Sequence, residues 1–336
     1  MNRTHCRIRF VGCCGLVVAC AAAPAYADCP PHSQAYTQVG DVVHCKCDDG
    51  YQKSSGGCVP AAPPANAAQC VAWDSRIDAM KGVASRASLA LDAYSFFDDN
   101  QDRPGITPWQ APWKAPSGYT LLSNDILQLR EMLPDMDSTL IKKFIAPDDS
   151  QYRAAIYRDD ASGTIFLVFR GTDMTKNNND WWKANIPNEL GEYTGYFAKA
   201  AVLATDLKQY TDAHGLALEC VGHSLAGGMC VGAAVHAHIP ATVFNAETVH
   251  SSALPQGDEI RTADDLVVDY VTAGEAVTSL QAMFFVPAPG IQVPLPDWPS
   301  GPISPIERHG MSFVRLSVQN RIQELVRDKA AVGCAP

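Results

Sequence analysis

The stretch ALECVGHSLAGGMCVGAAV, residues 217–235, joins an apolar run typical of a buried strand to a small-residue run typical of a helix. The polar residues His223 and Ser224 lie between the two runs. A sharp strand-to-helix turn has no room for large side chains two residues before and two residues after its central residue, and Gly222 and Ala226 meet that need. The pattern predicts that Ser224 projects its hydroxyl from the turn as a nucleophile, at a helix N-terminus that favours negative charge. An ordinary N-cap serine is the alternative interpretation.

Helix-like and strand-like runs alternate on both sides of this stretch, which favours an α/β fold with a mostly parallel sheet flanked by helices. A turn-forming DDASG separates two of the strand-like runs and predicts a hairpin. Helical spacing covers 78–97, 191–214, 226–238 and 309–327, and strand-like runs cover 151–157, 164–169, 216–221 and 266–271.

The first 27 residues have the pattern of an export signal. Three arginines precede an apolar run over 10–23, and an AxA cleavage site ends at Ala27. The apolar run is too short to remain in a bilayer as an anchor. We therefore expect a secreted or periplasmic protein. The residues before Cys20 resemble a bacterial lipobox, so a lipoprotein anchored through Cys20 is the alternative.

The mature chain is acidic. Cleavage removes three arginines and no acids, which takes the formal net charge from −10 to −13. This charge repels phosphate backbones, so nucleic acid is not expected as a partner. It also disfavours electrostatic adhesion to anionic membranes, but it leaves hydrophobic contact with a lipid interface open.

Residues 28–60 form a short segment rich in cysteine, glycine and proline. It is too small and too poor in aliphatic residues to build its own core, so disulfides must hold it. The eight cysteines that remain after cleavage are an even number, as expected of disulfides in an exported protein. We expect residues 61–69 to form an extended linker and 70–336 to form the main domain.

The run CKCDDGY within this segment resembles the last half of an EGF-like module, although only four cysteines are present where the full module has six. The resemblance implies disulfides between Cys47 and Cys58 and between Cys29 and Cys45. Whether the segment contacts a protein partner stays open. The pairing of the remaining cysteines also stays open, although Cys70 and Cys334 bracket the main domain and could join its ends; the others are Cys220 and Cys230.

Two motifs in the main domain resemble the lipase class 3 family, also called fungal-type lipases, of the α/β hydrolases. VGHSLAGG resembles its nucleophile elbow, which usually reads GHSLGG, and IFLVFRGTD resembles the strand that precedes its oxyanion hole. The resemblance covers roughly residues 75–325. It implies an α/β-hydrolase fold in which the backbone N–H groups of Thr172 and Leu225 hold the oxyanion.

The same resemblance implies the two partners of Ser224. The family carries its catalytic acid where this chain has Glu275, and its catalytic histidine near the C-terminus, where this chain has His309 at the start of the last helix. The order Ser224, Glu275, His309 is the one that α/β hydrolases use. Asp269 is the alternate acid, and Asp297 is a more distant one.

The segment DWWKAN resembles a family pattern near the lid and the acyl groove, so we expect Trp181 and Trp182 to bind substrate or to lie at a transient lipid interface. Packing of the two tryptophans onto the sheet is the alternative. No nucleotide fingerprint, phosphate loop or metal-binding motif is present, and no cofactor or metal is implied.

The sequence therefore predicts an exported serine ester hydrolase that acts on lipid esters, either a triacylglycerol lipase or a phospholipase A. The alternative from another class is a catalytically inactive hydrolase fold that serves as a binding or adhesion protein through its cysteine-rich segment. Acyl transfer to an alcohol would use the same acyl-enzyme, so the sequence does not separate it from hydrolysis.

Overall fold

The computed structural model describes most of the chain between Cys29 and Cys334. The predicted export signal, Cys20 and the tryptophan pair at 181–182 lie outside the described residues. The described ranges are 29–39, 42–55, 57–60, 67–98, 107–110, 114–147, 150, 152–172, 195–250, 253–255, 260–278, 281, 289–298 and 301–334.

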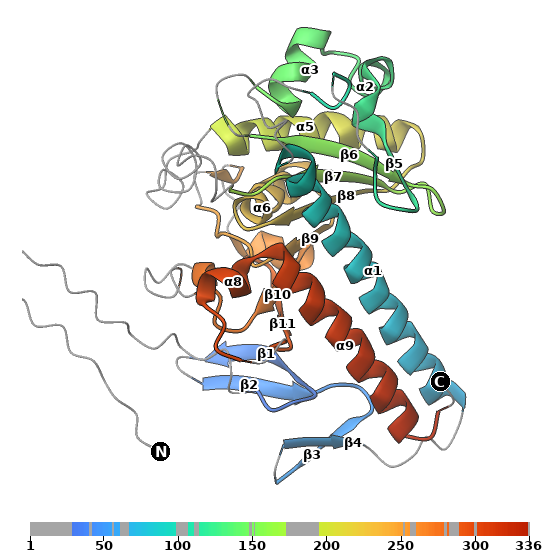
Figure 1. Cartoon of the computed structure of the whole chain (residues 1–336), viewed down its shortest axis with the longest axis vertical. Helices are drawn as coiled ribbons and strands as arrows, with labels where there is room; N and C mark the ends of the chain where they lie inside the picture. Colours follow the sequence, from blue (N-terminus) through green and yellow to red (C-terminus); the bar gives the residue numbers. More distant parts are fainter. Residues whose placement is uncertain are drawn as a thin grey trace, which may run out of the picture.

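A seven-stranded mixed sheet forms the centre of the protein (Figure 1). Its strands are β5 (Tyr119–Leu121), β6 (Ala154–Asp159), β7 (Ile165–Phe169), β8 (Leu218–His223), β9 (Ala241–Phe244), β10 (Val267–Thr272) and β11 (Ile291–Leu295). They lie in the order β11-β10-β9-β8-β7-β6-β5. The strands from β7 to β11 are parallel, whereas β6 pairs antiparallel with both β5 and β7. The predicted hairpin is therefore confirmed as β6 and β7, and the mostly parallel sheet is confirmed as well.

Helices cover both faces of this sheet (Figure 1). The longer ones are α1 (Ala67–Asp98), α5 (Gly195–Ala213), α6 (Leu225–Ala237) and α9 (Met311–Ala331), and the shorter ones are α2 (Ile126–Met132), α3 (Ser138–Ile145) and α8 (Pro305–His309). The main domain also contains two short 3₁₀ helices, η2 (Leu122–Asn124) and η5 (Ile260–Asp265).

Alternating strand residues divide the core into two layers. Leu167 of β7 packs with α5 and α6, and the next residue, Val168, packs with α1 and α9 on the other face. Every residue of α6 except His236 is buried, which explains why its sequence is apolar all round rather than amphipathic.

The parallel strands end at one edge of the sheet. Along β9, Phe244 is level with His223 of β8 on one side and with Tyr270 of β10 on the other. Residues that directly follow these strands therefore lie together at the carboxyl edge, where open α/β sheets bind their ligands.

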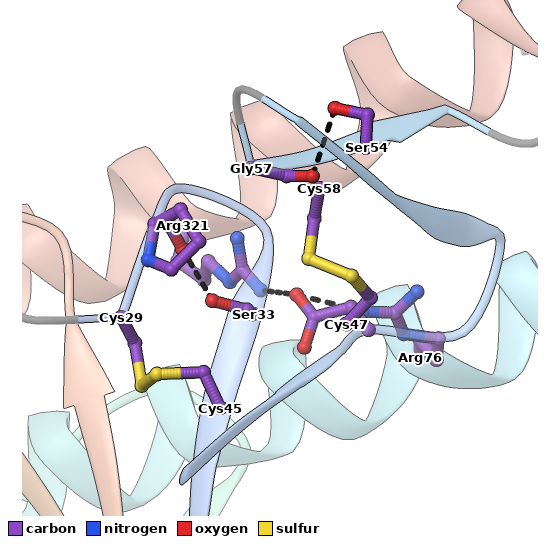
Figure 2. The surroundings of a disulfide bond; sticks show 11 residues. Cys29, Ser33, Cys45, Cys47, Ser54, Gly57, Cys58, Arg76 and Arg321 are labelled. Carbon is purple, nitrogen blue, oxygen red and sulfur yellow. Dashed lines mark hydrogen bonds and ion pairs between the residues drawn. A yellow bond between two sulfur atoms is a disulfide. The ribbon is translucent and has the colours of Figure 1, made fainter. Parts of the chain in front are cut away.

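The cysteine-rich segment forms two small antiparallel pairs, β1 (Ser33–Val39) with β2 (Val42–Cys47) and β3 (Tyr51–Ser54) with β4 (Gly57–Pro60). The disulfides Cys29–Cys45 and Cys47–Cys58 hold these pairs, as the EGF-like resemblance implied (Figure 2). A third disulfide, Cys70–Cys334, joins the start of α1 to the end of the chain, as the positions of these two cysteines suggested.

Charged and aromatic contacts dock this segment on α1 and α9. The Asp48 carboxylate is 2.6 Å from the Arg321 guanidinium and 3.4 Å from that of Arg76, and Figure 2 shows both arginines reaching the segment from the two helices. Gly50 has a φ of +83°, and a Cβ there would lie 2.5 Å from the Trp73 ring. At this point the segment is in direct contact with α1, and no side chain would fit between Gly50 and the Trp73 ring.

The larger differences from the sequence prediction concern α1, α8 and β11. The helix α1 begins at Ala67, so the last three residues of the predicted linker are helical. His309 does not open the last helix: it ends the separate helix α8, which Pro305 and a Ser304–Glu307 capping box start early, and Gly310 in an extended conformation separates α8 from α9. The edge strand β11 lies outside the strand-like runs that the sequence predicted.

Candidate active site

Ser224 occupies a strained corner between β8 and α6. Its φ of 60° and ψ of −128° lie in a region that residues other than glycine rarely adopt. Such a conformation costs about 1 to 3 kcal/mol and persists only where the surroundings enforce it. Here the Ser224 N–H donates to Phe244 O at 3.1 Å, and the Ser224 carbonyl accepts from Gly228 at 3.2 Å and from Glu247 at 3.0 Å. The neighbouring strand and the first turn of α6 therefore hold the corner in place.

Two glycines make the corner sterically feasible. A Cβ at Gly222 would lie 2.3 Å from the carbonyl oxygen of Ala226, and one at Gly227 would lie 2.6 Å from the Cβ of Ala246. Real Cβ atoms essentially never make contacts this short, so the strand can turn into the helix only because these positions lack side chains.

A disulfide spans the corner. Cys220 of β8 and Cys230 of α6 are bonded, with their Cα atoms 5.5 Å apart, and both are fully buried. The sequence left this pairing open. The bond ties the strand that precedes Ser224 to the helix that follows it.

His309 and Glu275 form a close pair. The Nδ1 atom of His309 is 2.5 Å from the Oε2 atom of Glu275, whose side chain is fully buried. The Glu275 carboxylate also accepts from the backbone N–H of Val277, at 2.8 Å, and from that of Thr278. These donors orient the carboxylate toward the imidazole.

The carboxylates of the two other candidate acids contact groups other than the His309 ring. The Asp269 carboxylate accepts from Ala246 N at 3.3 Å and from the Gln292 amide at 2.9 Å. Burial raises the pKa of Asp269 to about 7. Asp297 pairs with the Arg308 guanidinium. Of the three carboxylates considered, the structure brings only Glu275 to the His309 ring.

His309 lies at the same edge as Ser224. Its ring centroid is 4.7 Å from that of His223, the residue before Ser224, and its carbonyl oxygen is 2.6 Å from His223 Nε2. Among the described residues, no hydrogen bond joins the Ser224 hydroxyl directly to the His309 ring. Catalytic hydrogen bonds often form only when substrate is bound.

The end of β7 passes directly beside the serine corner. A Cβ at Gly171 would lie 2.4 Å from the carbonyl oxygen of His223, so only glycine allows this approach. Thr172 follows it and Leu225 follows Ser224, and both residues are buried. The two predicted N–H donors thus stand on the two chain segments that meet at the corner.

Sequence reasoning missed three polar residues that surround this cluster. Tyr94 on α1 has its hydroxyl 2.8 Å from His223 Nδ1, and nothing in the sequence links positions so far apart. Asn245 and Thr272 come directly after β9 and at the end of β10, and their placement at the carboxyl ends of predicted strands was a usable signal.

The fold and this cluster define a mixed α/β protein that carries a serine, a histidine and a carboxylate at the carboxyl edge of its sheet. Over the described residues, no helix combines the length and apolarity needed to cross a membrane. Nor do the His, Cys, Asp and Glu side chains of these residues gather in a group that could hold a metal ion.

Comparison with known proteins identifies the family to which this chain belongs. The profile of the Tle-like phospholipase domain matches residues 85–297, which is more than half of the chain, and the chain therefore belongs to this phospholipase-like family. An extracellular phospholipase A1 of Serratia liquefaciens is 30% identical over 158 residues, which cover 44% of this chain and 46% of that relative. The chain thus spans about half the length of the curated relative it matches.

Proposed function

We propose that the protein is a secreted serine hydrolase that cleaves carboxylic esters of lipids, with phospholipids as the leading substrate class. The Glu275–His309 pair beside the strained Ser224 corner is the observation that carries the proposal. Membership of the phospholipase-like family supports a lipid ester as substrate, and the phospholipase A1 relative favours cleavage of an acyl chain from a glycerophospholipid.

In the proposed reaction, His309 Nε2 takes the proton of the Ser224 hydroxyl while Oγ attacks the ester carbonyl carbon. The carbonyl electrons move onto the oxygen, which the N–H groups of Thr172 and Leu225 stabilise. Collapse of this intermediate expels the alcohol, which takes the proton from His309. Water then attacks the acyl-enzyme by the same steps, and it releases the fatty acid and restores Ser224. Throughout, Glu275 fixes the ring tautomer and stabilises the imidazolium.

We further propose that the main domain is an α/β hydrolase related to class 3 lipases, and that residues 28–60 form a partial EGF-like module. The parallel sheet with helices on both faces supports the first assignment, and the Cys29–Cys45 and Cys47–Cys58 bonds support the second. Secretion is supported by the four disulfides among the described residues and by the extracellular relative.

The test combines a serine-reactive fluorophosphonate probe with a substrate panel. We expect the wild type to be labelled and Ser224→Ala not to be. Labelling that persists in Ser224→Ala would exclude Ser224 as the nucleophile, and a folded wild type without labelling would favour a binding protein. The panel contains triglyceride, p-nitrophenyl esters and phosphatidylcholine with different acyl chains at its two positions. Release of one chain from phosphatidylcholine defines a phospholipase A and its position, whereas activity confined to triglyceride would refute the phospholipid assignment.

A further inference from the structure

The backbone carbonyl groups of Arg308 and of His309, the candidate catalytic histidine, accept hydrogen bonds from side chains rather than from the backbone of a helix. The helix α8 ends at His309, and Gly310, with φ −64° and ψ 142°, interrupts it before α9 begins. The last carbonyl groups of a helix have no partner within it. Thr272 Oγ1 is 2.9 Å from the Arg308 carbonyl oxygen, and His223 Nε2 is 2.6 Å from that of His309. The Asn245 amide is 3.2 Å from the His309 carbonyl oxygen.

We call His223, Asn245 and Thr272 the carbonyl clamp. They come from the carboxyl ends of three neighbouring strands, since His223 ends β8, Asn245 follows β9 and Thr272 ends β10. The clamp therefore connects the short α8 to three strands of the central sheet.

The hydrogen bonds of His223 fix its tautomer. A carbonyl oxygen only accepts, so Nε2 must carry the proton that it donates to His309 O, and Nδ1 then accepts from the Tyr94 hydroxyl at 2.8 Å. Burial, together with the nearby His309, lowers the pKa of His223 well below its ordinary value. The ring is therefore neutral, and it adds no positive charge beside His309.

The hydrogen bonds of Asn245 fix its orientation in the same way. Its Oδ1 atom accepts from the backbone N–H of Thr272 at 2.8 Å, which turns the amide nitrogen toward His309 O. Asn245 is fully buried and has a φ of +44°, a conformation that asparagine and aspartate tolerate better than other residues with a side chain. Both the backbone and the side chain of Asn245 are thus suited to this position.

We infer that the carbonyl clamp sets the distance between Ser224 and His309, and that its members are positioning residues for the reaction proposed above, on which this inference rests. Glu275 orients the His309 ring through Nδ1, but the clamp determines where the backbone carrying that ring lies. Because His223 directly precedes Ser224, one residue links the nucleophile's corner to the backbone of its base. Loss of the clamp changes the chemical step rather than substrate binding.

Matched variants test this role. His223→Leu removes the donor, whereas His223→Gln retains an amide N–H on a chain long enough to reach His309 O. Asn245→Asp keeps the shape and the tolerated backbone but replaces the donor with a carboxylate. We expect His223→Leu and Asn245→Asp to lower kcat roughly 10- to 100-fold, the range that a displacement of about 1 Å can cause, with KM nearly unchanged. His223→Gln is expected to recover most of the loss. A fall in activity that tracks only the loss of folded protein, or a change in KM alone, would overturn the inference.

A second measurement does not depend on activity. In Ser224→Ala labelled with nitrogen-15 at histidine, NMR is expected to show His223 as a neutral ring protonated at Nε2, with a downfield ring proton that disappears in His223→Leu. If the wild type hydrolyses esters but His223 is protonated at Nδ1 or charged at pH 7, the inference about the clamp is wrong while the proposed function stands. A folded wild type that cleaves no ester would overturn the proposed function and, with it, the positioning role, even if His223 keeps the expected tautomer.

Discussion

Cys220 and Cys230 form a buried disulfide that closes a short loop with Ser224 inside it. In the chain-entropy description, a loop of ten residues corresponds to a stabilisation of about 3 kcal/mol. The bond also holds β8 and α6 together on both sides of a strained residue. It therefore contributes both to stability and to the geometry of the candidate nucleophile.

We expect the double variant Cys220→Ala/Cys230→Ala to lose about 2 to 4 kcal/mol of unfolding free energy and to react more slowly with the fluorophosphonate probe. Urea unfolding and labelling rates on the folded fraction measure the two effects. The control is Cys47→Ala/Cys58→Ala in the cysteine-rich segment, which should lower stability without slowing the labelling of folded protein. Equal labelling rates for the two double variants would show that the elbow disulfide has no role in the site.

We expect neutralisation of the two buried carboxylates near the site, Glu275 and Asp269, to have different effects on activity. Glu275→Gln keeps the volume but loses the charge that stabilises a histidine cation, and losses of roughly 10⁴-fold are known for such a change in a serine triad. We expect kcat to fall by at least about 100-fold, with the fold retained. If Asp269→Asn abolishes activity and Glu275→Gln does not, Asp269 is the acid instead.

We expect Asp269 to affect the pH dependence of stability rather than the rate of catalysis. Burial raises its pKa from 3.8 to about 7, so the folded protein binds a proton that the unfolded chain releases between these values. Its contribution to stability is therefore fully present below about pH 4 and is lost as the pH rises through about 7. We expect Asp269→Asn to remove this dependence and to be more stable than the wild type above pH 7. Urea unfolding measured from pH 4 to pH 8 checks it, and an unchanged slope for the variant would contradict the assignment.

The serine corner could be predicted from the sequence because its determinants are local. Gly222 and Ala226 lie within two residues of Ser224, and the steric need they meet follows from backbone geometry alone. The Glu275–His309 contact joins residues 34 positions apart, and only resemblance to a known family brought them together. The Tyr94–His223 contact spans 129 positions and has no local signature, so it could be found only in the structure.

Two misplaced elements show where local signals were available. Pro305 with the Ser304–Glu307 pair is a helix start that the sequence displays, yet the last helix was predicted to begin only at His309. No strand was predicted at 291–295, where Pro294 has no N–H to donate to a sheet ladder. That strand is tolerated because β11 lies at the edge of the sheet.

The docking of the cysteine-rich segment gives a further prediction. The Asp48 side chain is 1% exposed and contacts two arginines, so removing its charge leaves both without their buried partner. We expect Asp48→Asn to cost about 3 to 5 kcal/mol. The control on the same helix as Arg76 is Lys81→Ala, which breaks an exposed pair with Asp78 and should change stability by less than about 1 kcal/mol. Similar losses for the two variants would show that the Asp48 contacts do not dock the segment.

Gly222 and Gly232 lie close together in the chain but differ in the space around them. Alanine substitutions at the two positions distinguish the steric requirement of the corner from the general effect of replacing a glycine. At Gly222 an added methyl would lie 2.3 Å from the Ala226 carbonyl oxygen, whereas at Gly232, further along α6, the nearest atoms would be 3.7 Å away. We expect Gly222→Ala to lower the free energy of unfolding by more than about 3 kcal/mol, or to abolish probe labelling if the protein relaxes by opening the corner. Gly232→Ala is expected to stabilise the helix by about 0.5 to 1 kcal/mol and to leave labelling unchanged, because alanine fits there and favours the helix more than glycine does. Urea unfolding and probe labelling of both variants make the comparison, and a Gly222→Ala protein with wild-type stability and labelling would show that the corner differs from the one described.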